Sequence, residues 1–129
     1  MASVFTKIIN GEIPSYKVAE NEKFYAFLDI NPLQKGHTLV VPKKEVDEFF
    51  AQDEETLAEM MVFAKSVAEK IKKTFPCNRV GMTVIGLEVP HAHMHLIPIH
   101  NEKDMNFQSP KLHLDGFEME QIAIKLREA

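Results

Sequence analysis

Three of the six histidines in this 129-residue chain lie within one short stretch and alternate with apolar residues: His91, His93 and His95. Alternation is the period of a β-strand, so the three imidazoles would line one face, roughly 7 Å apart. An imidazole can become charged near neutral pH and needs hydrogen-bond partners when buried, so three in a row are costly if they serve stability alone. The stretch therefore predicts a site of chemistry.

Three interpretations of this row follow from the residues themselves. Histidines two apart on a strand can share one metal ion. Alternatively, one imidazole can act as a nucleophile while the others orient it or stabilise charge. In the third interpretation, the row is only the solvated face of a histidine-rich strand. A metal site usually needs a further ligand and supporting hydrogen bonds, and Glu88 and His100 are the nearby candidates. The pattern alone leaves all three open.

The composition is that of an ordinary globular protein, with 45% hydrophobic and 26% charged residues. We expect a single domain over residues 1–129, which is long enough to bury a core. The net charge of −4 argues against a nucleic-acid partner bound through a basic surface, but it permits a small anionic ligand. The first residues lack the apolar run of a signal peptide, and no stretch could span a bilayer. We therefore expect a cytoplasmic protein with no membrane partner.

The hydrophobic pattern predicts five strands and two substantial helices. Strands are expected over residues 16–19, 24–28, 37–42, 79–85 and 91–99, with a short helical patch over residues 5–9. A long helix begins after Asp53 as N-cap and ends before Pro76, and a last helix begins at Asp115. The expected buried side of the long helix comprises Leu57, Met60, Met61, Ala64, Val67, Ala68 and Ile71. Short connections between strands imply an antiparallel sheet with helices on one face, which is the α+β class.

The histidine row resembles the signature of the histidine triad (HIT) family of nucleotide hydrolases and transferases. That signature is His-φ-His-φ-His-φ-φ, where φ is apolar, and it stands here as His91-Ala92-His93-Met94-His95-Leu96-Ile97. Residues 5–14, 27–30, Pro32 and residues 36–43 also resemble family segments in the expected order. The resemblance covers roughly residues 4–98, whereas the tail after Ile99 matches weakly. Within the family, this chain looks most like the histidine triad nucleotide-binding proteins.

The resemblance implies a five-stranded antiparallel sheet with a long central helix and a C-terminal helix. It also implies a homodimer whose sheets join across a two-fold axis. The long helix over residues 53–75 is the usual dimer-contact element in the family. The sheet agrees with the strand count reached from the pattern, whereas the dimer is implied by the resemblance alone.

The resemblance assigns catalytic roles to four histidines. The central histidine, His93, would attack the α-phosphorus of a nucleotide and form a nucleotidyl-imidazole intermediate that water resolves. The backbone carbonyl of His91 would orient it. His95 would donate a hydrogen bond to the phosphate and stabilise developing charge, and His37 would support proton handling near the leaving group.

The resemblance also implies a nucleotide-binding pocket. Asp29 matches a carboxylate that accepts hydrogen bonds from the ribose hydroxyls, although a turn residue ahead of Pro32 is an alternative interpretation. An apolar slot for a purine base is expected from Val4, Phe5, Ile8, Phe27 and Ile30. Any hydrophobic core would contain such residues too.

The chain departs from the family pattern at two places. Many members carry cysteines at the positions of Ser3 and Thr6, as part of a zinc site, so no metal is expected here. The segment before the triad is short, and Glu88 occupies the place of a phosphate-contacting hydroxyl. A carboxylate beside a phosphate is repulsive unless protonated or paired. Glu88 either tunes the choice of leaving group or points to solvent or to Arg79.

We expect a cofactor-independent hydrolase acting on purine nucleoside monophosphate derivatives of the phosphoramidate or acyl-adenylate type. Dinucleoside polyphosphate hydrolysis is one alternative, and a nucleotide-binding regulatory module with little turnover is another. A third alternative is a metal-dependent hydrolase with the triad histidines as ligands. His100 and His113 are expected at the surface, outside the site.

Overall fold

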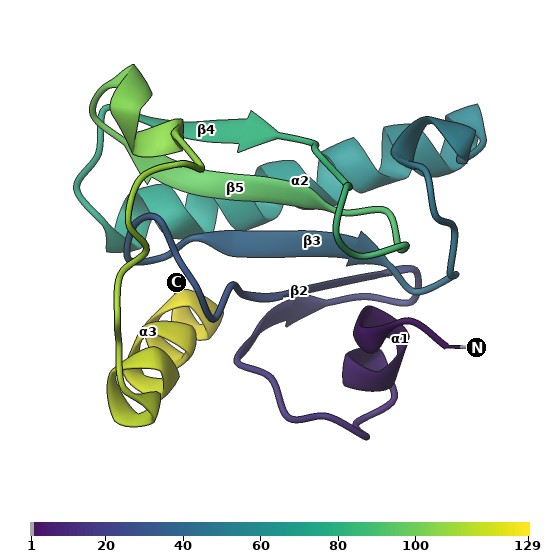
Figure 1. Ribbon diagram of the computed structural model, residues 1–129, viewed down its shortest axis with the longest axis horizontal. Coiled ribbons are helices and arrows are strands. Elements are labelled where there is room, and N and C mark those ends of the chain that lie inside the picture. Colours follow the sequence, from purple (N-terminus) through teal and green to yellow (C-terminus); the bar gives the residue numbers. More distant parts are fainter. Residues whose placement is uncertain (1) are drawn as a thin grey trace.

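The computed structural model describes residues 2–129 and arranges them around one five-stranded antiparallel sheet (Figure 1). The strands are β1 (Lys17–Glu20), β2 (Phe24–Leu28), β3 (Thr38–Pro42), β4 (Arg79–Thr83) and β5 (Met94–Ile99), in the spatial order β1-β2-β3-β5-β4. The helices are α1 (Val4–Ile9), α2 (Glu54–Thr74) and α3 (Gly116–Glu128), with short 3₁₀ turns η1 (Phe49–Ala51) and η2 (Glu102–Met105). The predicted α+β class and antiparallel five-stranded sheet are confirmed.

Each α-helix begins at a side chain that accepts a hydrogen bond from the first turn. Ser3, Asp53 and Asp115 cap α1, α2 and α3 by accepting from backbone N–H groups three residues on. Such caps satisfy donors that have no partner within the helix. The predicted N-caps Asp53 and Asp115 are therefore confirmed.

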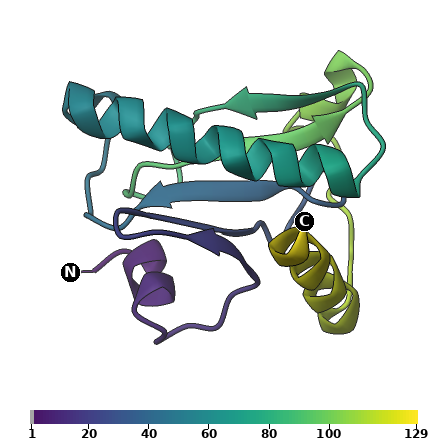
Figure 2. The same cartoon turned by 180° about the vertical axis from the view of Figure 1, so that it is seen from behind.

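The two faces of the sheet are covered differently. Helix α2 crosses one face (Figure 2), and α2 and α3 bury the larger core there with β-strand residues such as Val40, Met94 and Leu96. The opposite face carries a smaller apolar cluster of Phe5, Tyr25, Phe27, Leu39 and Val41 beneath α1. The second face is therefore only partly covered, which leaves room for a pocket.

Two details of α2 differ from the sequence prediction. Met61 is 48% exposed and does not enter the core, whereas Phe63 is buried. Val62, beside Met61 in the chain, is 72% exposed. The buried stripe of a helix 21 residues long shifts around its axis by small angles that spacing alone does not fix.

No helix within residues 2–129 is both long and apolar enough to cross a membrane.

The histidine-bearing strand starts later than predicted. Strand β5 begins at Met94, which pairs with Val40, so His91 and His93 precede the regular ladder. Beyond Val40 the neighbouring strand ends at Pro42, and proline has no N–H to offer the ladder. The backbone of Ala92 instead donates to the carbonyl of Val46 at 2.6 Å. The N–H of His91 likewise donates to the carbonyl of Val89 at 2.8 Å, so these hydrogen bonds are made outside the sheet.

The turn before β3 places His37 at the base of the site. Gly36 has a φ of +93°, and a Cβ there would lie 2.7 Å from the ring of Phe75. The left-handed conformation and the close approach both require glycine. This turn directs the chain into β3 antiparallel to β2, with Leu28 paired to Thr38.

Candidate active site

All four predicted site histidines are buried in the wall of the second face. His91 and His37 are 0% and 1% exposed, and His93 and His95 are each 7% exposed. The interpretation of the row as a solvated strand face is therefore wrong. By contrast, His100 and His113 are exposed, as predicted.

His93 is held in one orientation and one tautomer. Its Nδ1 lies 2.8 Å from the backbone carbonyl oxygen of His91, and since a carbonyl only accepts, Nδ1 carries the proton. The lone pair of a neutral His93 is then on Nε2. That nitrogen has no hydrogen-bond partner in the described chain and is not sealed from solvent. The ring of Phe5 contacts the ring of His93 edge-on, with 5.0 Å between ring centroids.

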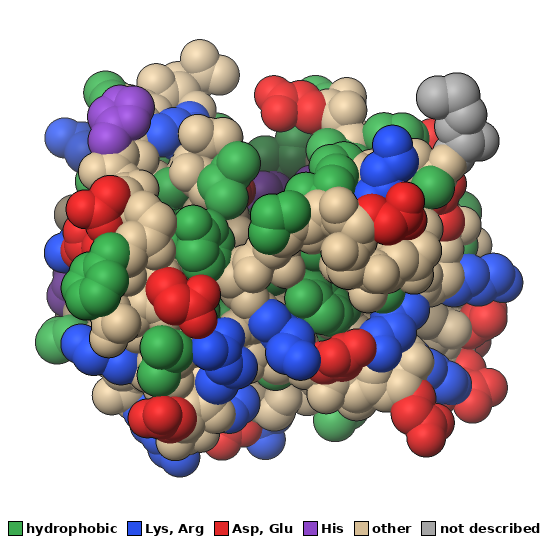
Figure 3. Space-filling view, turned by 90° about the horizontal axis from the view of Figure 1, so that it is seen from below, with side chains coloured by type: hydrophobic (Ala, Val, Ile, Leu, Met, Phe, Trp, Pro, Cys, Tyr) green, Lys and Arg blue, Asp and Glu red, His purple; other side chains and the backbone are tan. Residues whose placement is uncertain are grey.

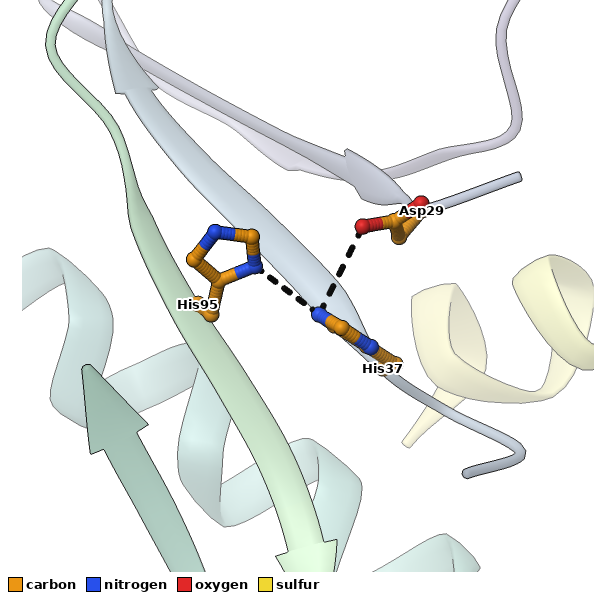
Figure 4. Close-up of side chains that lie close together, drawn as sticks. All are labelled: Asp29, His37 and His95. Atoms are coloured by element: carbon orange, nitrogen blue, oxygen red, sulfur yellow. Dashed lines mark hydrogen bonds and ion pairs between the residues drawn. The ribbon is translucent and has the colours of Figure 1, made fainter. Parts of the chain in front are cut away.

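His37 and His95 form a hydrogen-bonded chain that fixes both tautomers (Figure 4). Leu33 donates its backbone N–H to Nδ1 of His37 at 3.0 Å, so a neutral His37 carries its proton on Nε2. That N–H faces Nδ1 of His95 at 2.9 Å. Nδ1 of His95 therefore accepts, and its proton lies on Nε2. Within residues 2–129, no group accepts from the Nε2–H of His95.

Burial keeps these rings neutral. Burial, together with the charges of His95 and Lys111, lowers the pKa of His37 to about 3. Burial, reinforced by His93, lowers the pKa of His95 to about 4. The pKa of His91 is also lowered, mainly by burial. At neutral pH His37 and His95 are therefore two uncharged rings joined by a hydrogen bond.

Asp29 lies at the end of β2 beside this chain. Its Oδ2 is 3.6 Å from Nε2 of His37, and its Oδ1 accepts the backbone N–H of Asn31 at 2.8 Å. Burial raises the pKa of the carboxyl against the opposing effect of the Asn31 hydrogen bond. The carboxylate therefore lies next to the histidines, where it can accept a hydrogen bond from a ligand. It also stabilises the turn at Asn31, in agreement with the alternative interpretation of Asp29 as a turn residue.

The residues able to share a metal differ from the triad. In residues 2–129, the ligand atoms that gather within 4.8 Å of one another belong to Asp29, His37 and His95. The ring of His91 points elsewhere, because its Nε2 donates to the carbonyl of Pro42 at 2.7 Å. The hypothesis of a metal held by His91, His93 and His95 together is therefore wrong. In the Asp29 group, both ring nitrogens of His37 are already engaged with Leu33 and His95.

A second network, which the sequence analysis did not foresee, holds the ring of His91. Ser3 Oγ lies 2.7 Å from Nδ1 of His91 and acts as the donor, since the opposite ring nitrogen carries the proton. Glu45 accepts the backbone N–H of Ser3 at 2.7 Å and the hydroxyl of Thr6 at 2.6 Å. These bonds lower the pKa of Glu45 to about 2. Ser3 and Thr6, at the positions where many family members carry cysteines, make hydrogen bonds here that connect α1 to His91 and Glu45.

One pocket of about 620 Å³ brings the predicted nucleotide-binding residues together. Its lining includes Asp29, Glu88, His93 and His95 and the apolar residues Val4, Phe5, Ile8, Phe27 and Ile30. His37 and His91 stand behind the wall and do not line it. Figure 3 shows hydrophobic side chains at the rim of a hollow with histidine at its bottom. A shallower hollow of about 670 Å³, between residues 21–24 and α2, contains no histidine.

The pocket also contains residues that the sequence analysis missed. Phe107, Gln108 and Lys111 come from the segment between η2 and α3, which no motif marked. Only the fold brings this segment to the site, so spacing gave no signal for it. Glu88 is exposed and lines the pocket, and no ion pair with Arg79 occurs among residues 2–129.

Comparisons with known proteins agree with this geometry. A model of the HIT domain family matches residues 10–102. An uncharacterised HIT-like protein of Methanocaldococcus jannaschii is 44% identical over 99 residues, covering 74% of this chain and 77% of the relative. Adenosine 5′-monophosphoramidase HNT1 of Saccharomyces cerevisiae is 40% identical over 103 residues, covering 79% of this chain and 65% of that protein.

Solved structures show the same similarity. A hypothetical histidine triad nucleotide-binding protein of Sulfolobus tokodaii superposes with a TM-score of 0.85 at 34% identity. The superposition covers 97% of this chain and 89% of the other.

Proposed function

Because the chain belongs to the HIT domain family, we propose that it hydrolyses purine nucleoside monophosphate derivatives at the α-phosphate, through a covalent intermediate on His93. The observation that carries the proposal is the state of His93. Its Nδ1–H is fixed on the carbonyl of His91, and its Nε2 lone pair is free at the pocket. A neutral imidazole is nucleophilic at neutral pH and is also a good leaving group afterwards.

In the proposed first step, Nε2 of His93 forms a bond to the α-phosphorus. The bond from phosphorus to the leaving group breaks, and the leaving group departs with the electron pair. An amine leaving group takes up a proton from solvent as it departs, and the attacking water of the second step returns one. Nε2–H of His95 donates to a phosphoryl oxygen and stabilises the charge that develops there. Water then attacks the phosphorus, loses a proton, and releases His93 as neutral imidazole.

The leading substrate is an adenosine phosphoramidate or an acyl-adenylate. Support comes from the yeast relative, which is named an adenosine 5′-monophosphoramidase. The apolar slot supports a purine base, since Phe5, Ile8 and Phe27 offer aromatic and aliphatic surface. Asp29 is proposed to accept the ribose hydroxyls. Dinucleoside polyphosphates are the alternative substrate class.

We also propose that the protein is a cytoplasmic homodimer. Two features support a second copy at the β4 edge of the sheet. Strand β4 is an edge strand, and Met82 on it is 47% exposed. On α2, Met61 and Val62 place apolar surface outward. Edge strands and exposed apolar patches are features that a subunit interface covers.

Intact-protein mass spectrometry after rapid quenching tests the proposed chemistry. Wild-type protein, His93→Ala and the surface control His100→Ala are mixed with adenosine phosphoramidate, with and without chelator. We expect an added mass of one nucleoside monophosphate on wild type and His100→Ala, and none on His93→Ala. Tight nucleotide binding with no adduct and no turnover would instead indicate a binding module. Activity abolished by the chelator would contradict the proposed nucleophile.

A further inference from the structure

The segment over residues 106–111 forms a wall of the pocket next to the triad. The ring of Phe107 contacts His95 with 4.9 Å between centroids and His37 with 6.0 Å. The segment is anchored by the backbone of Leu112, which donates to the carbonyl of Pro32 at 2.8 Å. A part of the chain that follows the triad by about a dozen residues thus closes one side of the site.

Lys111 is positioned within this wall by its own segment. Its Nζ donates to the carbonyls of Phe107 at 2.6 Å and Ser109 at 3.3 Å. An ammonium has three N–H donors, so these two bonds orient it and leave one donor free. No ion pair joins Lys111 to a carboxylate within residues 2–129, so its charge is not neutralised locally.

The charge balance of the pocket makes this lysine important for an anionic ligand. Among the residues within 2–129 that line the pocket, Asp29 and Glu88 are acidic, and Lys111 is the one lysine or arginine. The histidines His37 and His95 stay neutral at pH 7. The field of Lys111 reaches the others, since it lowers the pKa of Asp29 and of His37. It is therefore the fixed positive charge available to offset two carboxylates.

The ring contacts show on which side of the triad this charge lies. Phe5, in the apolar slot, contacts His93 at 5.0 Å, and His93 contacts His95 at 5.2 Å. His95 contacts Phe107 at 4.9 Å, and Nζ of Lys111 lies 6.0 Å from the centre of the Phe107 ring. The row runs from the apolar slot through the nucleophile to Lys111. In the proposed pose, with the base in the apolar slot and the α-phosphorus at His93, the leaving group lies on the Lys111 side of the pocket.

We propose that Lys111 forms a subsite for a negative charge carried by the leaving group of the substrate. The inference rests on the proposed function and refines it: the preferred substrate carries an anion beyond the α-phosphate. That anion is either the next phosphate of a polyphosphate chain or the carboxylate of an amino-acid phosphoramidate. Phe107 separates this subsite from the neutral pair of His37 and His95.

Equilibrium binding to His93→Ala protein tests the subsite without turnover. The ligands are AMP, ADP and adenosine 3′,5′-bisphosphate, which carries its extra phosphate on the ribose instead. We expect ADP to bind more tightly than AMP, and Lys111→Gln to weaken ADP about tenfold more than AMP. Lys111→Arg should keep the preference, and Lys103→Gln, an exposed lysine on η2, should behave as the parent. AMP binding that is retained shows that the pocket of the variant is intact.

Kinetics with Lys111 variants of otherwise wild-type protein identify the source of the anion. Adenosine phosphoramidate with ammonia as leaving group is compared with the glycine phosphoramidate. A rise in KM for the glycine compound alone assigns the subsite to a carboxylate, whereas weaker binding of ADP alone assigns it to a phosphate.

An equal loss of affinity for AMP and ADP, a loss of affinity confined to the 3′,5′-bisphosphate, or no change in affinity would overturn the proposal. An ADP preference without any adduct on wild-type His93 would sink the hydrolase but not the subsite.

Discussion

His91 and His95 flank His93, the proposed nucleophile, yet the protein holds them in opposite ways. The ring of His91 is locked between the carbonyl of Pro42 and the hydroxyl of Ser3, and only its backbone carbonyl serves His93. The ring of His95 is held on one side by His37 and keeps Nε2–H for the pocket. Two identical side chains four residues apart are therefore held differently, one to support His93 and the other, in the proposed mechanism, to contact the phosphate. What separates them is which ring nitrogen the surrounding fold leaves free.

The largest effect is expected from His95→Ala, which removes the imidazole. Losing a donor aimed at the phosphoryl oxygen should lower kcat by about 10²- to 10³-fold, with KM little changed. Steady-state kinetics on an adenosine phosphoramidate measure this, with His100→Ala as the matched surface control. A rise in KM with kcat unchanged would mean that His95 acts in binding rather than in the chemical step.

Acid should destabilise the site because its histidines are buried in the neutral form. The folded pKa values of His37 and His95 lie at about 3 and about 4, below the ordinary histidine value of 6.5. The unfolded chain then binds more protons, so this contribution is present above pH 6.5 and is lost as pH falls through the window from 6.5 to about 4. We expect the free energy of unfolding to drop by a few kcal/mol between pH 7 and pH 4. Urea titrations should show a flatter dependence for His95→Gln but not for His100→Gln.

Phe107→Ala should move the acid limb of the rate profile. Removing a ring that packs 4.9 Å from His95 admits water and raises the pKa of that imidazole from about 4 toward 6.5. Once protonated, Nδ1 of His95 can no longer accept from His37. We expect kcat at pH 5 to fall roughly tenfold relative to pH 8 in the variant. Exposed Phe117→Ala is the control, and an unchanged pH–rate profile would contradict this role for Phe107.

Ser3→Ala should have the smallest effect and test the structural half of the comparison. The change removes both the cap of α1 and the donor to His91, so we expect a loss of about 1–2 kcal/mol in unfolding free energy. Asp53→Ala also removes a helix cap, at a distance from the histidines. If the Ser3 network positions His93, kcat should fall a few-fold in Ser3→Ala and stay unchanged in Asp53→Ala. Equal kcat in both variants would limit Ser3 to stability.

The sequence indicated much of the fold because local signals and packing agree here. Asp53 and Asp115 mark helix starts by their own hydrogen bonds, and Met60, Ala64, Val67 and Ile71 of the long helix are buried as predicted. Boundaries that depend on neighbours were less accessible. The start of β5 moved to Met94 because Pro42, some fifty residues earlier, ends the strand beside it.

The sequence by itself determined the residue types of the site: histidines at period two, a carboxylate after β2 and apolar residues on α1. The tertiary structure alone decided the states of those residues. Which nitrogen of each imidazole is protonated depends on partners such as Leu33, Pro42 and Ser3, which lie outside the motif. The tertiary structure also brings Lys111 and Phe107 into the pocket. Tautomers and charge balance are set by contacts between segments distant in the chain, and short-range spacing does not encode such contacts.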